Sequence, residues 1–275
     1  PINLYYLFLG HVANWTNSSL IITFHFARLL TSFLLLIQIF RLSWQTFEED
    51  VPRWIVFLLA SLGLGMGWLA LPFGMLTPDF WLSEAFPLLA IQANAHFPLG
   101  LALQLYFFRT ASSTDPSWKA LGLSAVFGLV LALVYPFGFV ISLAILAIQT
   151  GILTSNHAER IVPAKRLLAT GVLGGPLLLA QWLIIQAHPA LSIWDAQNQT
   201  PMPAVLPLLI AFSPGLFLSL LYLAKSRGAL TKIDLLLVVW LGAAFSLAIL
   251  PFNLQRRLLS GVSIPITFLA IKALW

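Results

Sequence analysis

Residues 77–108 read TPDFWLSEAFPLLAIQANAHFPLGLALQLYFF, and the second part of this stretch decides the fold. From residue 85 to residue 108 it contains no lysine, arginine, aspartate or glutamate. An uncharged apolar run of about 18 residues or more is long enough to cross the hydrocarbon core of a bilayer as a helix. The stretch therefore predicts a transmembrane helix, preceded by a short loop that carries two acids.

The rest of the chain has the same character: 60% of its residues are hydrophobic, only 8% are charged, and the mean hydropathy is +0.93. Because soluble domains contain about 25% charged residues, this composition predicts an all-α, polytopic transmembrane helix bundle. The alternating pattern of an outer-membrane barrel is absent. We expect an N-terminal interfacial helix over residues 2–13 and about nine spanning helices. The expected spans cover residues 20–42, 54–72, 85–108, 119–135, 137–153, 166–187, 203–223, 233–250 and 258–275.

No linker, composition change or repeat divides these spans, so we expect a single integral membrane domain over residues 1–275. The fourth and fifth spans are joined only by residues 135–138 (YPFG), which predict a tight turn. The sequence begins at Pro1 without a methionine, and we therefore expect the chain to be truncated at its N-terminus. The absence of cysteine excludes disulfides, thiolate metal sites and thiol nucleophiles.

The distribution of lysine and arginine predicts which loops face the cytoplasm. Ten of the 14 basic residues lie in loops 43–53 (with Arg41), 109–119, 154–166 and 224–233, whereas loops 14–19, 73–84, 135–138 and 188–202 have none. Since cytoplasmic loops of membrane proteins are enriched in these residues, the first set is expected inside and the second outside. The net charge of +5 is scattered over short loops, which argues against nucleic acid as a partner.

Three arginines depart from this charge distribution and are candidates for binding an anion. Arg28 lies about two turns inside the first span from its external end, one turn after His25, and Arg256 and Arg257 fall in an external loop. Planar guanidinium groups suit a phosphate. The alternatives stay open that Arg28 reaches the lipid headgroups or pairs with a carboxylate, and that Arg256 and Arg257 only anchor their loop to anionic lipids.

The remaining candidates belong to the opening stretch. Asp79 and Glu84 could act as an acid–base pair or hold a divalent cation, or they are solvated loop acids. His96, with Asn94 beside it, is expected inside the membrane, where it either contacts a substrate or metal or makes a structural hydrogen bond. Pro98 is expected to break or kink the span at this point.

Together these pieces resemble the GT-C class of polytopic membrane glycosyltransferases, which includes protein O-mannosyltransferases and lipid A aminoarabinose transferases, and poorly characterised bacterial members in particular. Most of the chain contributes to the resemblance through short motifs. The motifs are residues 1–11, 25–30 (HFARLL), 63–69 (GLGMGWL), 79–84 (DFWLSE), 94–98 (NAHFP), 135–137 (YPF) and 255–265 (QRRLLSGVSIP).

The resemblance implies transfer of a sugar from a polyprenyl-phosphate-linked donor to an acceptor on the external face of a bacterial plasma membrane, as in synthesis of the cell envelope. It implies that Arg28, Arg256 and Arg257 bind the donor phosphate, and that His25, Asn94 and His96 contact the substrate. Asp79 and Glu84 would give supporting acid–base catalysis or bind a divalent cation. The main base of this class follows its first helix, in a segment that would lie before Pro1.

Two other functions fit the same residues. A transporter or flippase of a lipid-linked or small anionic substrate would use Arg28 and His96 along its pathway, with glycine and proline breaking the helices. Such folds often contain inverted repeats, and the sequence has none. A scaffold or assembly subunit without catalytic activity is the third interpretation.

Overall fold

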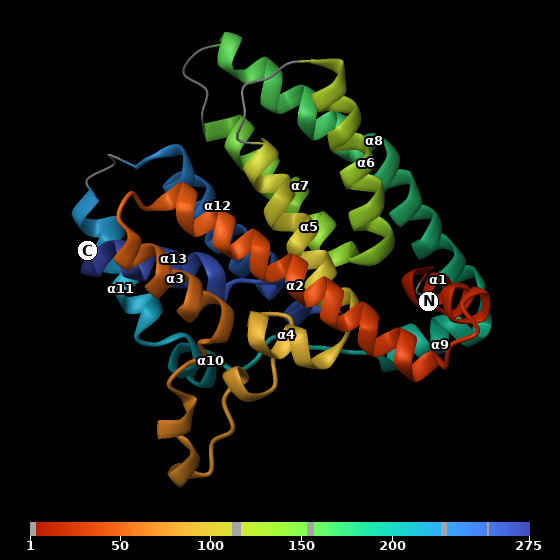
Figure 1. Ribbon diagram of the computed structural model, residues 1–275, viewed down its shortest axis with the longest axis horizontal. Coiled ribbons are helices and arrows are strands. Elements are labelled where there is room, and N and C mark those ends of the chain that lie inside the picture. Colours follow the sequence, from red (N-terminus) through yellow and green to blue (C-terminus); the bar gives the residue numbers. More distant parts are fainter. Residues whose placement is uncertain (1–3, 112–116, 153–156, 227–229, 252) are drawn as a thin grey trace. The chain divides into compact units, whose positions relative to one another are not determined.

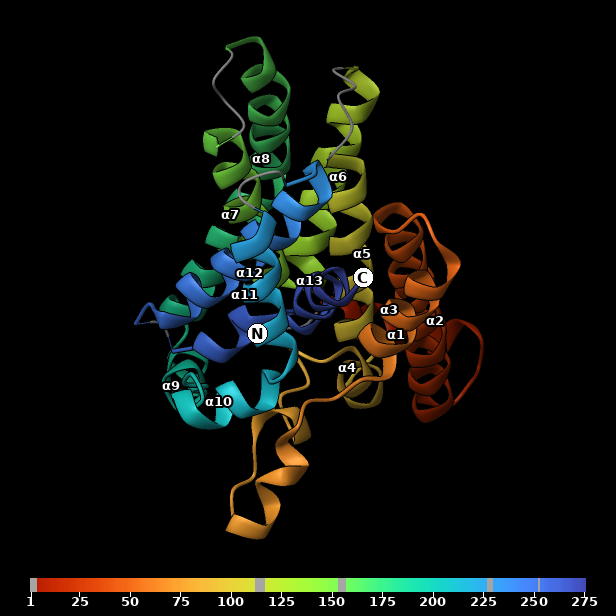
Figure 2. The same ribbon diagram turned by 90° about the vertical axis from the view of Figure 1, so that its left-hand side faces the viewer.

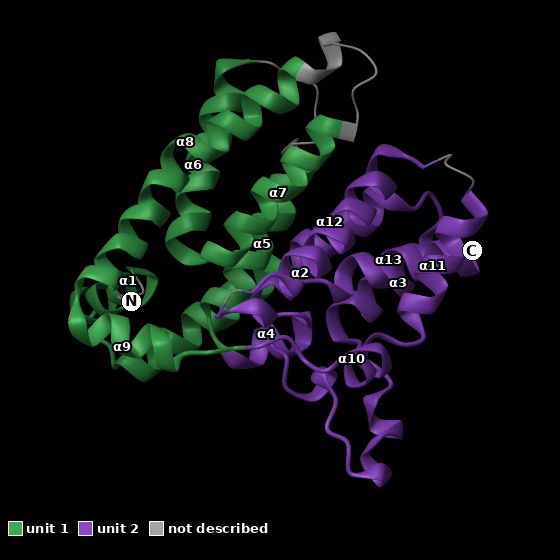
Figure 3. Cartoon of the chain, turned by 180° about the vertical axis from the view of Figure 1, so that it is seen from behind, with its two compact units in different colours: residues 1–35, 94–200 green, residues 36–93, 201–275 purple. Residues whose placement is uncertain are grey.

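A computed structural model describes residues 4–275 except 112–116, 153–156, 227–229 and 252 (Figure 1). All regular structure in these residues is helical and none of them forms a strand, which confirms the all-α class. Contacts within the chain divide it into two compact units (Figure 3). Unit 1 comprises residues 1–35 and 94–200, and unit 2 comprises residues 36–93 and 201–275.

The described part of unit 1 consists of helices of 9 to 31 residues and the first part of α2. They are α1 (Leu4–Trp15), the first part of α2 (Leu20–Thr46), α5 (His96–Ala111), α6 (Trp118–Val134), α7 (Pro136–Ile152), α8 (His157–Ala187) and α9 (Pro189–Gln197). The helix expected over residues 2–13 is present as α1. The tight turn between the fourth and fifth expected spans is also confirmed, because α6 ends one residue before Tyr135 and α7 begins one residue after it.

Close backbone packing holds α6 and α8 side by side in unit 1 (Figures 1 and 2). A Cβ atom added to Gly128 would lie 2.1 Å from the carbonyl oxygen of Thr170. A larger residue would therefore push the two helices apart, as expected for small residues at helix contacts within a membrane.

Unit 2 combines shorter helices with an irregular segment. Its helices are the end of α2, α3 (Asp50–Leu62), α4 (Pro87–Ala93), α10 (Val205–Phe212), α11 (Gly215–Ser226), α12 (Lys232–Ile249) and α13 (Ser263–Leu274). In the described part of this unit they are accompanied by the 3₁₀ turns η1 (Gly67–Leu69), η2 (Leu71–Phe73), η3 (Pro78–Phe80) and η4 (Gln255–Leu259). The irregular segment of residues 63–86 extends away from the helices of this unit in its middle part, whereas Glu84 and Ala85 at its end are hydrogen-bonded to Gly261 and Ser263 (Figures 1 and 2).

Three of the expected spans are interrupted. The helix expected over 54–72 ends at Leu62, since glycine at positions 63, 65 and 67 disfavours helix. The span expected over 85–108 is divided into α4 and α5 at Asn94, and Pro98 lies in the first turn of α5, where proline is tolerated. The span expected over 203–223 bends by 77° between α10 and α11, at Pro214.

Four helical segments in the described residues are long and apolar enough to cross a membrane: Leu20–Thr46, Ile161–Ala187, Lys232–Ile249 and Gln255–Leu274. A fifth is added if α10 and α11 count as one broken span. The helices α6 and α7 are apolar but only 17 residues long. The structure is thus consistent with an integral membrane protein, but the nine spans are not confirmed.

Candidate functional site

Asp79 makes hydrogen bonds within the irregular segment of unit 2, residues 63–86. It lies in η3 and is only 2% exposed. Its Oδ2 accepts a hydrogen bond from the backbone N–H of Gly67 at 2.9 Å, and its Oδ1 accepts one from the Thr77 hydroxyl at 2.5 Å. A Cβ on Gly67 would lie 2.2 Å from Oδ1, so glycine is required for this contact. Because both carboxylate oxygens already have donors, Asp79 serves to hold the loop.

Glu84 is buried as deeply but has few partners. Glu84 is only 4% exposed, and its Oε2 accepts a single long hydrogen bond of 3.4 Å from the Ser83 hydroxyl. Among the described residues, no lysine or arginine nitrogen lies within 4.0 Å of its carboxylate. A buried carboxylate without a cation is energetically unfavourable unless another group completes it.

The backbone around Glu84 joins the loop to the start of α13. The Glu84 carbonyl accepts a hydrogen bond from the N–H of Gly261 at 2.8 Å, and the Ala85 carbonyl accepts one from the N–H of Ser263 at 3.3 Å. These two bonds place the carboxylate-bearing loop beside the connection between η4 and α13.

Arg256 and Arg257, which the sequence places in a loop expected to be external, lie in η4. The Arg256 guanidinium lies 5.4 Å from the ring centroid of Trp81, which is within the range of a cation–π interaction. The Arg256 Nε atom is buried and has no acceptor among the described residues. Arg257 follows on the same turn. Gln255 fastens this turn, since its Oε1 accepts from the N–H of Met202 at 3.1 Å and its Nε2 donates to the Leu250 carbonyl at 2.9 Å.

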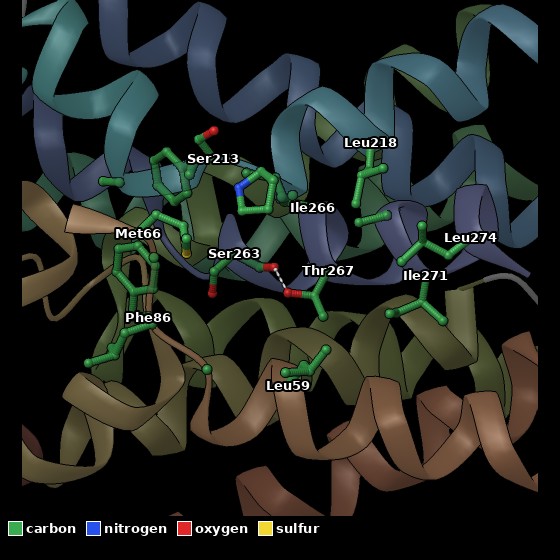
Figure 4. Close-up of a pocket in the computed structure, with 18 residues that line it drawn as sticks. Leu59, Met66, Phe86, Ser213, Leu218, Ser263, Ile266, Thr267, Ile271 and Leu274 are labelled. Atoms are coloured by element: carbon green, nitrogen blue, oxygen red, sulfur yellow. Dashed lines mark hydrogen bonds between the residues drawn. The ribbon is translucent and has the colours of Figure 1, made fainter. Parts of the chain in front are cut away.

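Phe86, two residues after Glu84, lines an apolar cavity of about 300 Å³ (Figure 4). Its walls come from the irregular segment and from α3, α10, α11 and α13, and include Met66, Leu218 and Ile266. The hydroxyl of Ser263 is buried at this cavity without a hydrogen-bond partner in the described part of the chain. The cavity can therefore take an apolar chain close to the acid-bearing loop.

The other predicted residues belong to unit 1. His96 is the first residue of α5, and its Nδ1 lies 2.8 Å from the Tyr6 hydroxyl of α1. Asn94 precedes this helix. His25 is exposed on α2, and Arg28 lies one turn further along. Sequence reasoning gave no role to Tyr6, although it noted the short apolar segment that carries it.

A further polar cluster in unit 2, around Asp234, was not predicted from the sequence. Asp234 is fully buried and forms an ion pair with Lys272 at 2.5 Å. Its Oδ2 also accepts from the Tyr222 hydroxyl at 2.9 Å and from the N–H of Thr231 at 3.0 Å. The spacing of Thr231 and Asp234 matches a capping box with aspartate in the third helical position, and this was the available signal.

The described residues contain no group of three or more histidine, aspartate and glutamate side chains that could hold a metal ion. A divalent cation at Asp79 and Glu84 therefore stays a prediction from the sequence. No protein-family model matches the chain, and neither a curated protein nor a solved structure matches it at a significant level.

Proposed function

We propose that the protein is a membrane glycosyltransferase that moves a sugar from a polyprenyl-phosphate-linked donor to an acceptor on the external face of a bacterial plasma membrane. One observation carries the proposal: buried Glu84, with no described lysine or arginine within 4.0 Å, lies three residues after Trp81, against which Arg256 packs. Charged groups left incompletely paired in apolar surroundings are costly, and they are typical of sites that a substrate completes.

The chemistry of these groups fits glycosyl transfer. The acceptor hydroxyl attacks the anomeric carbon of the sugar, and its proton passes to a carboxylate, for which Glu84 is the supporting group. The bond between the anomeric carbon and the phosphate oxygen breaks, and its electron pair leaves with the polyprenyl phosphate. The positive charges of Arg256 and Arg257 stabilise the negative charge that develops there.

The cavity at Phe86 supports a lipid-linked donor over a soluble one. It is apolar, its volume of about 300 Å³ accommodates part of a hydrocarbon chain, and it borders the loop that carries Glu84. In this proposal the phosphate lies near Arg256 and Arg257 while the first units of the chain enter the cavity. The resemblance assigns contacts with the donor to Arg28, His25, Asn94 and His96 as well.

The proposal keeps loops 73–84 and 251–257 on the external side, as the distribution of lysine and arginine indicates. The nine crossings expected from the sequence would require the shorter helices α6 and α7 to span the membrane, together with the interrupted pairs α4–α5 and α10–α11.

The test uses the full chain, purified in detergent and incubated with polyprenyl-phosphate mannose or aminoarabinose that carries a radiolabel in the polyprenyl chain, with a membrane extract as acceptor. We expect release of polyprenyl phosphate that falls at least 100-fold in Glu84→Gln, in line with loss of an acid–base group. Glu49→Gln, in an exposed residue beside α3, is the matched control. Equal release by wild type and both variants would contradict the assignment of Glu84.

A transporter or flippase is the second candidate, and the 77° bend between α10 and α11 favours it. Broken helices line the substrate sites of many transporters. Sealed vesicles containing the protein separate the two functions. Movement of a lipid-linked sugar between leaflets, without release of polyprenyl phosphate, would support the transporter and overturn the glycosyltransferase.

A further inference from the structure

The apolar cavity at Phe86 follows one face of α13. Its lining residues on this helix recur every three or four positions: Ser263, Ile266, Thr267, Ala270, Ile271 and Leu274. Because residues at such spacings lie on one side of a helix, the cavity runs along α13 from its first residue to its last. At 1.5 Å per residue, this path is about 16 Å long. Leu59 of α3 and Leu218 of α11 line the cavity on opposite sides of α13 (Figure 4).

The two ends of the cavity differ in polarity. Ser213 and Ser263 lie at the end that also contains Phe86, whereas the residues labelled at the other end, among them Ile271 and Leu274, are apolar (Figure 4). The cavity therefore matches a molecule that has a polar group at one end and a hydrocarbon chain at the other.

The Ser263 hydroxyl is available to such a molecule. Ser263 is only 7% exposed, and its hydroxyl has no hydrogen-bond partner in the described part of the chain. Its backbone groups are both used, since the N–H donates to the Ala85 carbonyl at 3.3 Å and the carbonyl accepts from the Thr267 hydroxyl at 2.8 Å. A buried hydroxyl without a hydrogen bond costs free energy, and in native proteins such a group requires an explanation.

The hydroxyl end of the cavity is also the end beside the loop that carries Glu84. The residues on either side of the connection are hydrogen-bonded, Gly261 to the Glu84 carbonyl at 2.8 Å and Ser263 to the Ala85 carbonyl. From this end the cavity follows α13, which belongs to a segment long and apolar enough to cross a membrane. A chain in the cavity would thus run along that segment, with its polar end next to the Glu84 loop.

We propose that the cavity binds a single-chain amphiphile in one direction. An oxygen of the head group accepts a hydrogen bond from the Ser263 hydroxyl, and the hydrocarbon chain follows α13 toward Leu274. A phosphate oxygen suits the hydroxyl, because hydrogen bonds to charged acceptors are stronger than those between neutral groups. The inference deepens the proposed function, on which it rests for the identity of the amphiphile as a polyprenyl phosphate. It adds Ser263 as a contact of the donor.

The first test removes the hydroxyl with Ser263→Ala. Binding of geranylgeranyl phosphate to the full chain in detergent is measured by isothermal titration calorimetry, and thermal unfolding is recorded without ligand. We expect Ser263→Ala to bind about tenfold more weakly, in line with loss of a hydrogen bond to a charged group. Its unfolding temperature without ligand should be unchanged or higher, because the variant lacks an unsatisfied buried hydroxyl.

Ser219→Ala is the matched control. Ser219 of α11 is fully buried as well, but its hydroxyl donates to the carbonyls of Gly215 at 2.8 Å and Ile266 at 2.9 Å. This variant should unfold at a lower temperature and bind geranylgeranyl phosphate as the wild type does. Unchanged binding in Ser263→Ala, or a fall of its unfolding temperature as large as that of Ser219→Ala, would overturn the inference.

The second test concerns the direction of the chain. Ala270 lines the cavity seven residues, or about 10 Å, from Ser263. Ala270→Leu should weaken binding of geranylgeranyl phosphate at least tenfold and leave geranyl phosphate, whose chain is half as long, within about threefold of wild type. Ala273→Leu, in a half-buried residue of α13 outside the cavity lining, should change neither. Equal losses for both ligands in Ala270→Leu, or no loss for either, would contradict the proposed direction.

A two-chain phospholipid is the other occupant that a membrane offers. Displacement of geranylgeranyl phosphate by an equal concentration of dioleoylphosphatidylglycerol would overturn a single-chain site, whereas retention supports it. None of these measurements requires transfer of a sugar. Binding that depends on Ser263, without release of polyprenyl phosphate from a sugar donor, would support the inference and overturn the glycosyltransferase. Release that is unchanged in Ser263→Ala, with unchanged binding, would do the reverse.

Discussion

Two charged clusters in the described part of unit 2, around Asp234 and around Glu84 and Arg256, differ in how their charges are compensated. At one end of the α12–α13 pair, Asp234 has Lys272, Tyr222 and the Thr231 amide as partners. In the connection at the other end, Arg256 packs on Trp81 of the loop that carries Glu84. The first cluster is complete without a ligand, whereas the second is not. The first cluster stabilises the fold, whereas under the proposed function the charges of the second cluster bind a substrate.

The ammonium group of Lys272 shows how complete the first cluster is. Besides its ion pair with Asp234, it lies 5.9 Å from the ring centroids of both Phe47 and Tyr222. The cluster thereby links α11, α12 and α13 to the end of α2. Such a buried pair gives little net stability relative to apolar residues, but removal of one partner leaves an uncompensated charge.

The largest effect is expected from removing one partner of the ion pair between Asp234 and Lys272. Lys272→Met leaves Asp234 buried without a cation and should lower the free energy of unfolding by about 3–5 kcal/mol. The double variant Asp234→Asn/Lys272→Met should recover most of the loss. Thermal unfolding in detergent measures both. Equal destabilisation of the single and double variants would show that the ion pair itself is not the source of the effect.

The second prediction concerns Glu84, the buried carboxylate without a cation among the described residues. Glu84→Gln should leave the unfolding temperature unchanged or slightly raised, because it removes an incompletely paired buried charge. At the same time the release of polyprenyl phosphate should fall by about 100-fold, which corresponds to about 2.7 kcal/mol. Parallel measurements of unfolding and of release on one preparation check this. A large loss of stability without a change in release would make Glu84 a structural residue like Asp234.

A smaller effect is expected for the arginine. Arg256→Gln should weaken binding of polyprenyl phosphate by about tenfold, or about 1.4 kcal/mol. Arg53 provides a control with matched surroundings, because it lies 5.5 Å from the ring centroid of Trp44 but is paired with Asp50 at 2.9 Å. Arg53→Gln should not change binding. Equal weakening by both variants would indicate attraction by net charge alone.

The smallest effect concerns the aromatic partner. Trp81→Leu removes the ring beneath Arg256, and since cation–π contacts at partly exposed sites contribute about 0.5–1 kcal/mol, binding of polyprenyl phosphate should weaken about two- to fivefold. Trp44→Leu is the corresponding control at Arg53 and should leave binding unchanged. Unaltered binding in Trp81→Leu would mean that the η4 turn positions Arg256 without the indole.

Composition and apolar run length were sufficient to predict helices, the turn at Tyr135 and the short first helix. They failed where a helix is interrupted without a change in polarity. Asn94 and Pro214 lie within apolar runs, and hydropathy does not distinguish a break there from a continuous helix. The glycines after Leu62 fall within an expected span, although their weak helix propensity favours the irregular segment found.

The candidate site was predictable only in part, for a related reason. Arg256 is identifiable in the sequence because a basic residue in a loop expected to be external departs from the charge distribution. Lys272 conformed to that distribution and therefore attracted no attention, and its partner Asp234 is on another helix. Contacts between distant residues, such as Trp81 with Arg256 or Tyr6 with His96, depend on tertiary packing that residue patterns do not contain.

The contact between Asp234 and Lys272 has a topological consequence. It fixes α12 and α13 as an antiparallel hairpin, in which the first residues of one helix lie beside the last residues of the other. With 18 residues at 1.5 Å each, α12 is about 27 Å long. If the hairpin crosses a bilayer, the cluster of Asp234 and the cluster of Glu84 and Arg256 face opposite compartments, whatever the number of preceding crossings. One accessibility reporter at either end then assigns the orientation of both.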